Sequence, residues 1–196
     1  MSENKSSDRR ILKTQKAIRQ ALAELLQEKE LRKITVQEIV DKADISRVTF
    51  YKYYLDVYDL YDKIENEMLI NMGLIVLQLS DNSIDEFFNK LISYIYDNRV
   101  TFTMIFGTNI TSNLKDKLSK LIEGTFRKIY SEKLGVAIEN QELIYICCYR
   151  SNGFLAVIER WVQGGFREPC NNITKTISEL DKNIEQYFSD KIKKSK

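Results

Sequence analysis

The sequence has 196 residues, enough for a small N-terminal module followed by a larger bundle, each with its own core. It contains no histidine, and its three cysteines have no metal-ligand spacing, so we predict no catalytic, metal or cofactor site. The net charge is only +2, so nucleic-acid binding has to be judged from where the charges lie. One proline and seven glycines leave few helix breakers, which predicts an all-α protein.

The first predicted helix ends near Glu28 and has a basic face. Its apolar residues recur at three- and four-residue spacing, which is the pattern of a helix packed by one side. Residues 9–23 contain no acid but five cations: Arg9, Arg10, Lys13, Lys16 and Arg19. Such a face either is simply solvated or contacts DNA phosphates, and we predict phosphate contacts for Arg9, Arg10 and Lys13.

Two short helices joined by a tight turn are predicted next. Thr35 and Glu38 form a capping box, in which the Thr35 hydroxyl accepts from the backbone N–H of Glu38 and the Glu38 side chain returns the bond. Asp44 lies where this helix must stop, and aspartate tolerates the left-handed conformation of a turn. Ser46 can cap the next helix only two residues later. Two helices joined so closely cross steeply, which predicts a helix-turn-helix.

The second of these helices, within residues 46–54, carries the most specific chemistry. It contains no acid, and Phe50 and Tyr54 are its predicted buried residues. In a helix of this kind the N-terminal side chains can meet base edges in the major groove of DNA, while hydroxyls and cations meet phosphates. The alternative is a helix with aromatic packing and incidental charge.

The segment from Ile34 to Tyr51 reads ITVQEIVDKADISRVTFY and resembles the DNA-binding domain of the TetR family of bacterial regulators. The resemblance runs from about Arg10 to Ile64. It implies that the helix after Ser46 reads the major groove, and that a C-terminal domain dimerises and often binds a small effector. Carried over position by position, the resemblance implies these DNA-binding residues: Thr35, Ser46, Arg47, Val48, Thr49, Tyr51, Lys52 and Tyr53. Among them, Arg47, Val48 and Lys52 would face bases.

Four positions depart from the family pattern. The family usually has glycine at the position of Asp44 and a small residue or proline at that of Val48. The lysines that commonly flank the start of the following helix are here Leu55 and Val57, and the second of them normally contacts a phosphate. Either the affinity for the DNA backbone is lower, or the basic residues of the first helix supply more of the electrostatic attraction to the phosphates. A co-activator that acts through a protein partner, with weak or no direct DNA binding, is therefore the alternative function.

A longer helix capped by Asp56 is predicted to continue to about Leu79 and to connect two domains. We place the helix-turn-helix domain at residues 1–64 and a helical dimerisation and effector domain at 65–196. Ser83 begins a second capping box. Further helices are predicted over residues 83–98, 102–106, 112–130, 140–162 and 172–190.

The long apolar stretch of residues 143–162 contains Arg150, Asn152 and Glu159, which would be costly in lipid. We interpret it as a buried helix and not as a membrane span. The polar N-terminus has no apolar signal region, and the odd number of cysteines suits a reducing compartment, so we expect a cytoplasmic protein.

The last two predicted helices suggest self-association. Apolar residues of the final helix alternate steps of four and three, the pattern of a helix packed along another helix: Ile173, Ile177, Leu180, Ile184 and Tyr187. Together with the helix before it, this resembles the pair that forms the four-helix dimer interface in the TetR family. The alternative is an intramolecular bundle. We predict a homodimer.

The C-terminal half is rich in aromatic residues, which either line a ligand cavity or are ordinary core. We predict an effector pocket lined by Tyr94, Phe102, Phe106, Tyr145, Tyr149 and Asn152. Arg150 and Asn152 need partners, which could be a ligand, Glu159 or the second subunit. Residues 161–169 are similar to a pattern in the branch of the family that includes activators of dihydroxyacetone kinase operons. The leading interpretation is a repressor that binds a near-palindromic double-stranded DNA operator and is released by a small molecule.

Overall fold

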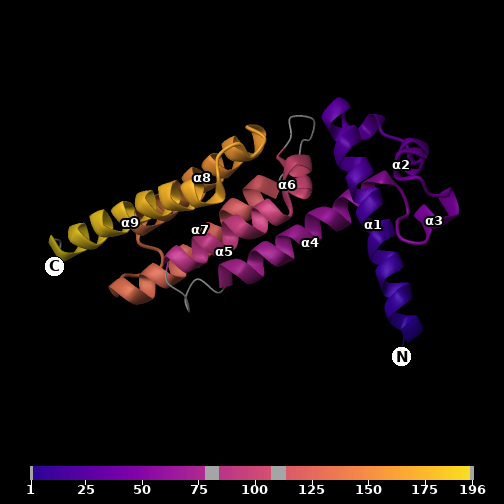
Figure 1. Ribbon diagram of the computed structural model, residues 1–196. Coiled ribbons are helices and arrows are strands. Elements are labelled where there is room, and N and C mark those ends of the chain that lie inside the picture. Colours follow the sequence, from indigo (N-terminus) through magenta and orange to yellow (C-terminus); the bar gives the residue numbers. More distant parts are fainter. Residues whose placement is uncertain (1, 78–83, 107–113, 195–196) are drawn as a thin grey trace. The chain divides into compact units, whose positions relative to one another are not determined.

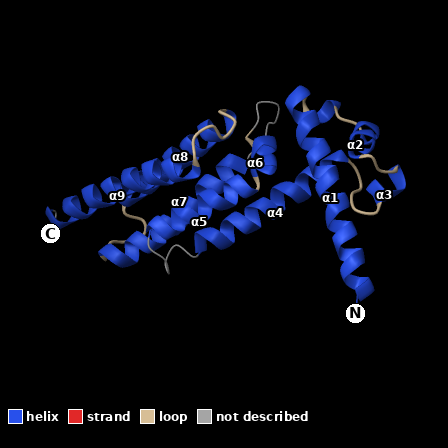
Figure 2. Cartoon of the chain, viewed as in Figure 1, coloured by secondary structure: helices blue, strands red, loops and turns tan. Residues whose placement is uncertain are grey.

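The computed structural model describes residues 2–77, 84–106 and 114–194. In these residues all regular secondary structure is helical and there is no strand, which confirms the predicted all-α class (Figure 1, Figure 2). The elements in chain order are α1 (Ser2–Glu28), the 3₁₀ turn η1 (Leu31–Lys33), α2 (Val36–Ala43), α3 (Arg47–Tyr51), α4 (Val57–Leu77), α5 (Ile84–Asp97), α6 (Arg99–Ile105), α7 (Leu114–Leu134), α8 (Gln141–Gln163) and α9 (Cys170–Lys194).

Several helix ends differ from the prediction for identifiable reasons. Helix α7 continues to Leu134 because the first residue able to end it is Gly135, which adopts a positive φ of 63°. Helix α9 begins two residues early, at Cys170, because the Pro169 carbonyl accepts the first bonds of its opening turn. The predicted boundary at residues 80–83, including the capping box at Ser83, lies outside the described residues.

The chain divides into two compact units. The first holds α1, η1, α2, α3, α4 as far as Met68, and α6. Helix α1 packs against both α2 and α6. The core of this unit consists of fully buried apolar side chains: Ile18, Leu22, Ile39, Phe50, Leu60 and Phe102. The burial of Phe50 and Tyr54 confirms the inward side predicted for the recognition helix, and it leaves the other side of α3 available.

The second unit holds α4 from Leu69 together with α5, α7, α8 and α9. Its main packed pairs are α7 with α8 and α5 with α9, and α8 also lies along α9. Apolar side chains fill its core, with Leu118, Leu143 and Cys147 fully buried. None of the described helices is both long and apolar enough to cross a bilayer.

Candidate DNA-binding surface and ligand pocket

The turn between α2 and α3 is built by the residues that the sequence singled out. The Thr35 hydroxyl accepts from the backbone N–H of Glu38 at 3.3 Å, and the Glu38 carboxylate accepts from the Thr35 N–H at 3.0 Å. Asp44 is in the left-handed region, with φ 52° and ψ 52°. The Ser46 hydroxyl accepts from the Thr49 N–H at 3.1 Å. Local hydrogen bonds therefore fix how α3 leaves α2, and the predicted turn is confirmed.

The exposed side of α3 presents polar and aliphatic groups together. Val48 is 70% exposed, and Arg47, Tyr51 and Lys52 are also exposed. Thr49 and Tyr53 are half-buried, while Thr35 and Ser46 are exposed. All eight predicted DNA-binding residues thus lie on α3, at its two ends or at the cap of α2, within one compact unit.

Arg47 has a partner that sequence reasoning missed. Its Nε donates to the Oε1 of Gln37 at 2.6 Å, and the Gln37 amide donates to Asp41 at 2.5 Å. The bonded chain links α2 to the first residue of α3. Its i, i+4 half, Gln37 to Asp41, was readable in the sequence. The link orients the Arg47 guanidinium, since the Nε bond leaves the two terminal nitrogens to point away from Gln37.

The predicted phosphate-binding cations have no acidic partner among the side chains that the structure describes. Arg9, Arg10, Lys13 and Lys52 are exposed, and none of them forms an ion pair in the described part of the chain. Other lysines of the same unit are engaged by acids: Lys29 by Glu38, Lys42 by Glu24 and Glu28, and Lys63 by Asp59. The unpaired cations are therefore the ones available to an anion such as the DNA backbone.

The start of α4 shows what replaces the two family lysines. Leu55 is 78% exposed, whereas Val57 is only 5% exposed and packs into the unit. The Asp59 carboxylate accepts from the Leu55 N–H at 2.8 Å and from Lys63 at 2.9 Å, and these bonds lower the pKa of Asp59. Lys63 also donates to the Tyr53 carbonyl at 3.1 Å. The Asp59–Lys63 pair was visible as an i, i+4 pattern, and it ties the turn after α3 to α4.

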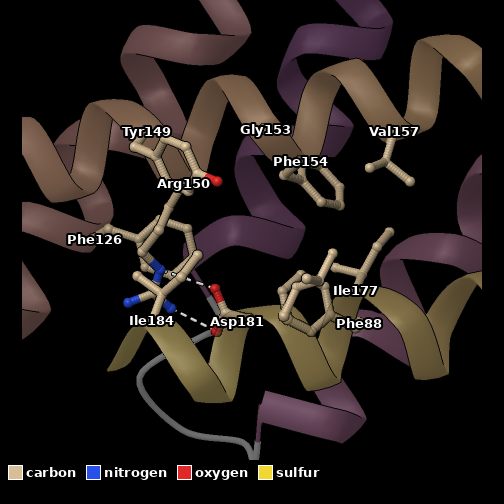
Figure 3. A pocket seen from close by; sticks show the side chains of 11 residues that line it. Phe88, Phe126, Tyr149, Arg150, Gly153, Phe154, Val157, Ile177, Asp181 and Ile184 are labelled. Atoms are coloured by element: carbon tan, nitrogen blue, oxygen red, sulfur yellow. Dashed lines mark hydrogen bonds and ion pairs between the residues drawn. The ribbon is translucent and has the colours of Figure 1, made fainter. Parts of the chain in front are cut away.

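A cavity of about 220 Å³ lies in the second unit between α5, α7, α8 and α9 (Figure 3). Its lining is mostly aromatic and aliphatic: Phe88, Phe126, Tyr149, Arg150, Gly153, Phe154, Val157, Ile177, Leu180, Asp181 and Ile184. Of the six predicted pocket residues, the lining includes Tyr149 and none of the other five.

The other five predicted pocket residues lie elsewhere in the fold. Phe102 and Phe106 belong to the first unit, where their buried rings stack at 6.1 Å. Tyr94 is half-buried on α5, and Tyr145 and Asn152 are exposed on α8. The structure therefore does not bring the six side chains together around one cavity.

The polar end of the cavity is an ion pair between α8 and α9. Arg150 Nε donates to Asp181 Oδ1 at 2.8 Å, and Nη2 donates to Oδ2 (Figure 3). The guanidinium carbon lies 4.3 Å from the centre of the Phe126 ring and 4.6 Å from that of Tyr130. Burial acts to lower the pKa of Arg150, but the Asp181 carboxylate and Tyr130 together outweigh burial and raise it. Arg150 therefore remains charged.

Two predicted partners for the polar residues of α8 are corrected by the structure. Glu159 does not pair with Arg150, because Glu159 lies nine residues further along the helix and bonds to Lys115 of α7. Asn152 is exposed and donates to the carbonyl of Cys148, one turn earlier, at 2.9 Å. No local sequence pattern connects Arg150 to Asp181, because the two residues lie 31 positions apart on two helices.

Helices α8 and α9 also present large apolar side chains to solvent. Tyr145 and Tyr149 of α8 are exposed, as are Leu180 and Tyr187 of α9. Two of the predicted pairing residues, Leu180 and Tyr187, are thus exposed, whereas Ile177 is buried in the unit. The repeat along α9 is therefore divided between packing inside the chain and an outward apolar face.

An all-helical chain with an N-terminal helix-turn-helix is typical of a DNA-binding transcription regulator. A family model described as the transcriptional regulator C-terminal region of the TetR type matches residues 82–183, just over half of the chain. The chain belongs to the TetR family of transcription regulators, which are not enzymes. A search of curated proteins found no match.

Three solved structures share the fold. The dihydroxyacetone kinase operon activator DhaS has 22% sequence identity and a TM-score of 0.56, with 85% of this chain and 93% of that chain covered. A TetR transcriptional regulator from Streptococcus agalactiae 2603V has 18% identity and a TM-score of 0.53, covering 90% and 98%. A Clostridium perfringens regulator named for fatty acid metabolism has 18% identity and a TM-score of 0.62, covering 83% and 94%. At these identities the likeness is one of fold.

Proposed function

We propose that this TetR-family regulator is a homodimeric repressor that acts in the cytoplasm, binds a near-palindromic operator through α3, and is released by a small-molecule effector. The observation that carries the proposal is the exposed side of α3, which has no acid and places Arg47, Val48 and Lys52 in solvent. The surrounding turn is rigidly hydrogen-bonded, so these side chains are presented by a fixed scaffold.

Each side chain of this surface has a role that its chemistry suits. Arg47 can donate two bonds to the O6 and N7 of guanine, and Val48 can contact the methyl group of thymine. Lys52 completes the base-facing set. Thr35 and the N-terminus of α2 would bind a backbone phosphate, because the first N–H groups of a helix favour an anion. The Thr35 hydroxyl, which donates to the Glu38 carboxylate at 2.9 Å, would exchange that bond for one to the phosphate. The unpaired cations of α1 add attraction that is independent of sequence.

The exposed apolar side chains of α8 and α9 support dimerisation. Large apolar groups that stay in solvent on adjacent helices are typical of an interface that a second copy covers. A two-fold dimer sets two recognition helices about one helical turn of DNA, or roughly 34 Å, apart. The operator should then contain two inverted half-sites at that spacing.

Effector control requires two states that differ in their affinity for DNA. A ligand releases the repressor only if it binds more tightly to the state with the wrong spacing of recognition helices. Helix α4 is the natural connector, because its residues to Met68 belong to one compact unit and those from Leu69 to the other.

The test is binding of the purified protein to labelled DNA from its own upstream region, compared with scrambled DNA across a salt series. We expect specific binding whose affinity falls steeply with salt, because each neutralised phosphate releases counterions. Equal affinity for the upstream and the scrambled DNA at every salt concentration would contradict direct operator binding.

The second candidate function is a co-activator that needs a protein partner. It is favoured by one observation: the family lysines at the start of α4 are replaced by an exposed Leu55 and a buried Val57. The structurally similar DhaS is itself named an operon activator. Under this alternative, DNA binding would be absent for the purified protein and would return when the partner is added.

A further inference from the structure

The cavity of the second unit offers an apolar surface with no net charge. Among the described residues that line it, the polar side chains are Tyr149, Arg150 and Asp181. The side chains of Arg150 and Asp181 are 2% and 8% exposed, and two hydrogen bonds join them. The two charges therefore cancel at the protein itself and leave none for a ligand to neutralise.

A charged ligand would meet an electrostatic penalty in this cavity. An anion at Arg150 would either lie beside the Asp181 carboxylate that already compensates the guanidinium, or displace that carboxylate and leave it buried without its partner. A cation near Asp181 would be repelled by the guanidinium already there. The cavity is partly open to solvent beside Tyr149 and Leu180, but a charge bound against its apolar lining would still lose hydration without gaining a free counter-charge, so the lining selects against both kinds of ligand.

The size and the walls of the cavity indicate the shape of the molecule. An engineered apolar cavity of about 150 Å³ binds benzene. A volume of about 220 Å³ therefore suits one or two rings. Phe88 and Phe154 lie on one side with ring centres 5.8 Å apart, and Phe126 lies near the ion pair (Figure 3). Aromatic walls favour a flat ring through stacked and edge contacts.

We infer that this cavity binds an uncharged aromatic molecule of one or two rings, and the inference rests on the proposed effector-controlled function. Such a ligand would lie between Val157 of α8 and Ile184 of α9, which line the cavity from two different helices, while the exposed Leu180 lies at its solvent side. Its occupancy would set the separation of α8 and α9, the same helices whose outer residues are proposed to pair in the dimer. The ligand would in this way act on the spacing of the two recognition helices.

The test uses three probes with one ring system and different charge: 2-naphthalenemethanol, 2-naphthoate and 2-naphthylmethylammonium. Binding to the full-length protein without DNA is measured by isothermal titration calorimetry at neutral pH. We expect the neutral probe to bind at least about tenfold more tightly than either charged probe, because only the charged probes must lose hydration without gaining a counter-charge.

A pair of glycine substitutions tests the location. A Cβ placed at Gly153 meets no atom within 4 Å, so Gly153→Leu adds a side chain at the cavity with no clash at its Cβ. Gly124 of α7 is equally open but does not line the cavity, so Gly124→Leu is the matched control. We expect Gly153→Leu to abolish binding of the neutral probe and Gly124→Leu to leave it unchanged.

Three results would overturn the inference: equal or tighter binding of a charged probe, unchanged binding in Gly153→Leu, or loss of dimerisation in Gly153→Leu with no probe bound by the wild type. The last result would assign the cavity to a side chain of a second copy. Operator binding by the ligand-free protein is measured separately. If the protein bound the neutral probe but not the operator, the proposed repressor function would be wrong and the inference about the cavity would still hold.

Discussion

At the scale of single residues, the recognition surface separates side chains that read sequence from those that add affinity. Arg47→Ala should relax the preference at one base pair of each half-site, at a cost of about 1–3 kcal/mol for the preferred base. Tyr53→Phe should weaken binding to all sequences alike, because a phosphate contact carries no sequence information. Both are measured by selection from a library of randomised half-sites. Identical selected sequences for both variants would contradict these roles.

Gln37 gives a second test of the same geometry. Its Oε1 accepts from Arg47 Nε, so it holds the guanidinium without itself having to touch a base. Gln37→Ala should broaden the selected base at the Arg47 position by less than Arg47→Ala does. Gln37→Glu keeps an acceptor for Arg47 but sets its second carboxylate oxygen against Asp41, so it should restore the preference only in part. A new preference at another base pair in Gln37→Ala would show that Gln37 reads DNA directly.

The Arg150–Asp181 pair makes a sharp prediction about stability. Asp181→Leu would leave a guanidinium that is 2% exposed without its counter-charge, and it should lower the free energy of unfolding by about 3–5 kcal/mol. The double variant Arg150→Met with Asp181→Leu should recover most of that loss, because it removes both charges from the core. Urea unfolding measures each variant.

Glu159→Gln is the control for that comparison. It breaks the exposed pair with Lys115, and it should change stability by less than about 1 kcal/mol. If Asp181→Leu were no more destabilising than Glu159→Gln, the Arg150–Asp181 pair would not be an electrostatic element of the core.

At the scale of helices, the capping box of α2 should respond to pH. A hydrogen bond from Lys29 and the backbone N–H of Thr35 lower the pKa of Glu38 from 4.5 to about 2. A carboxylate with a lowered pKa stabilises the folded state above its unfolded pKa and loses that effect as pH falls through its folded pKa. The contribution should therefore be complete above pH 4.5 and gone at about pH 2.

Glu38→Gln isolates this effect. It keeps a capping side chain but removes the charge, so wild type should be more stable than the variant above pH 4.5 and the difference should shrink below that pH. Urea unfolding across a pH series gives the difference directly. Glu132→Gln, at an exposed acid of α7 with no ion pair in the described residues, is the control. A difference that stays constant down to pH 2 would be inconsistent with the lowered pKa.

Features built from neighbouring residues could be predicted from the sequence, whereas features built from several helices could not. Thr35, Asp44 and Ser46 act through bonds to residues three to five positions away, so their neighbours in the chain were enough to identify the turn. The all-α class followed in the same way from local spacing. The cavity could not be predicted, because its lining comes from four helices and its ion pair joins residues 31 positions apart. Phe102 looked like a C-terminal pocket residue, yet α6 packs on α1.

At the scale of the whole molecule, the outward faces of α8 and α9 should decide the oligomeric state and, through it, operator affinity. Leu180→Glu places a charge on the apolar face of α9, where the side chain is 52% exposed. The single chain tolerates it, but a second copy could cover it only by burying the charge. We expect at least about a tenfold weaker dimer, measured by sedimentation equilibrium.

Leu74→Glu provides a closely matched control, because Leu74 of α4 is 56% exposed but lies outside the proposed interface. It should remain dimeric. A monomer positions only one recognition helix, so Leu180→Glu should also lose the preference for an operator with two half-sites over one with a single half-site, whereas Leu74→Glu should keep it. Dissociation of both variants or of neither would place the interface on a different face. Dissociation of Leu180→Glu with an unchanged preference would mean that the two recognition helices are not coupled through α8 and α9.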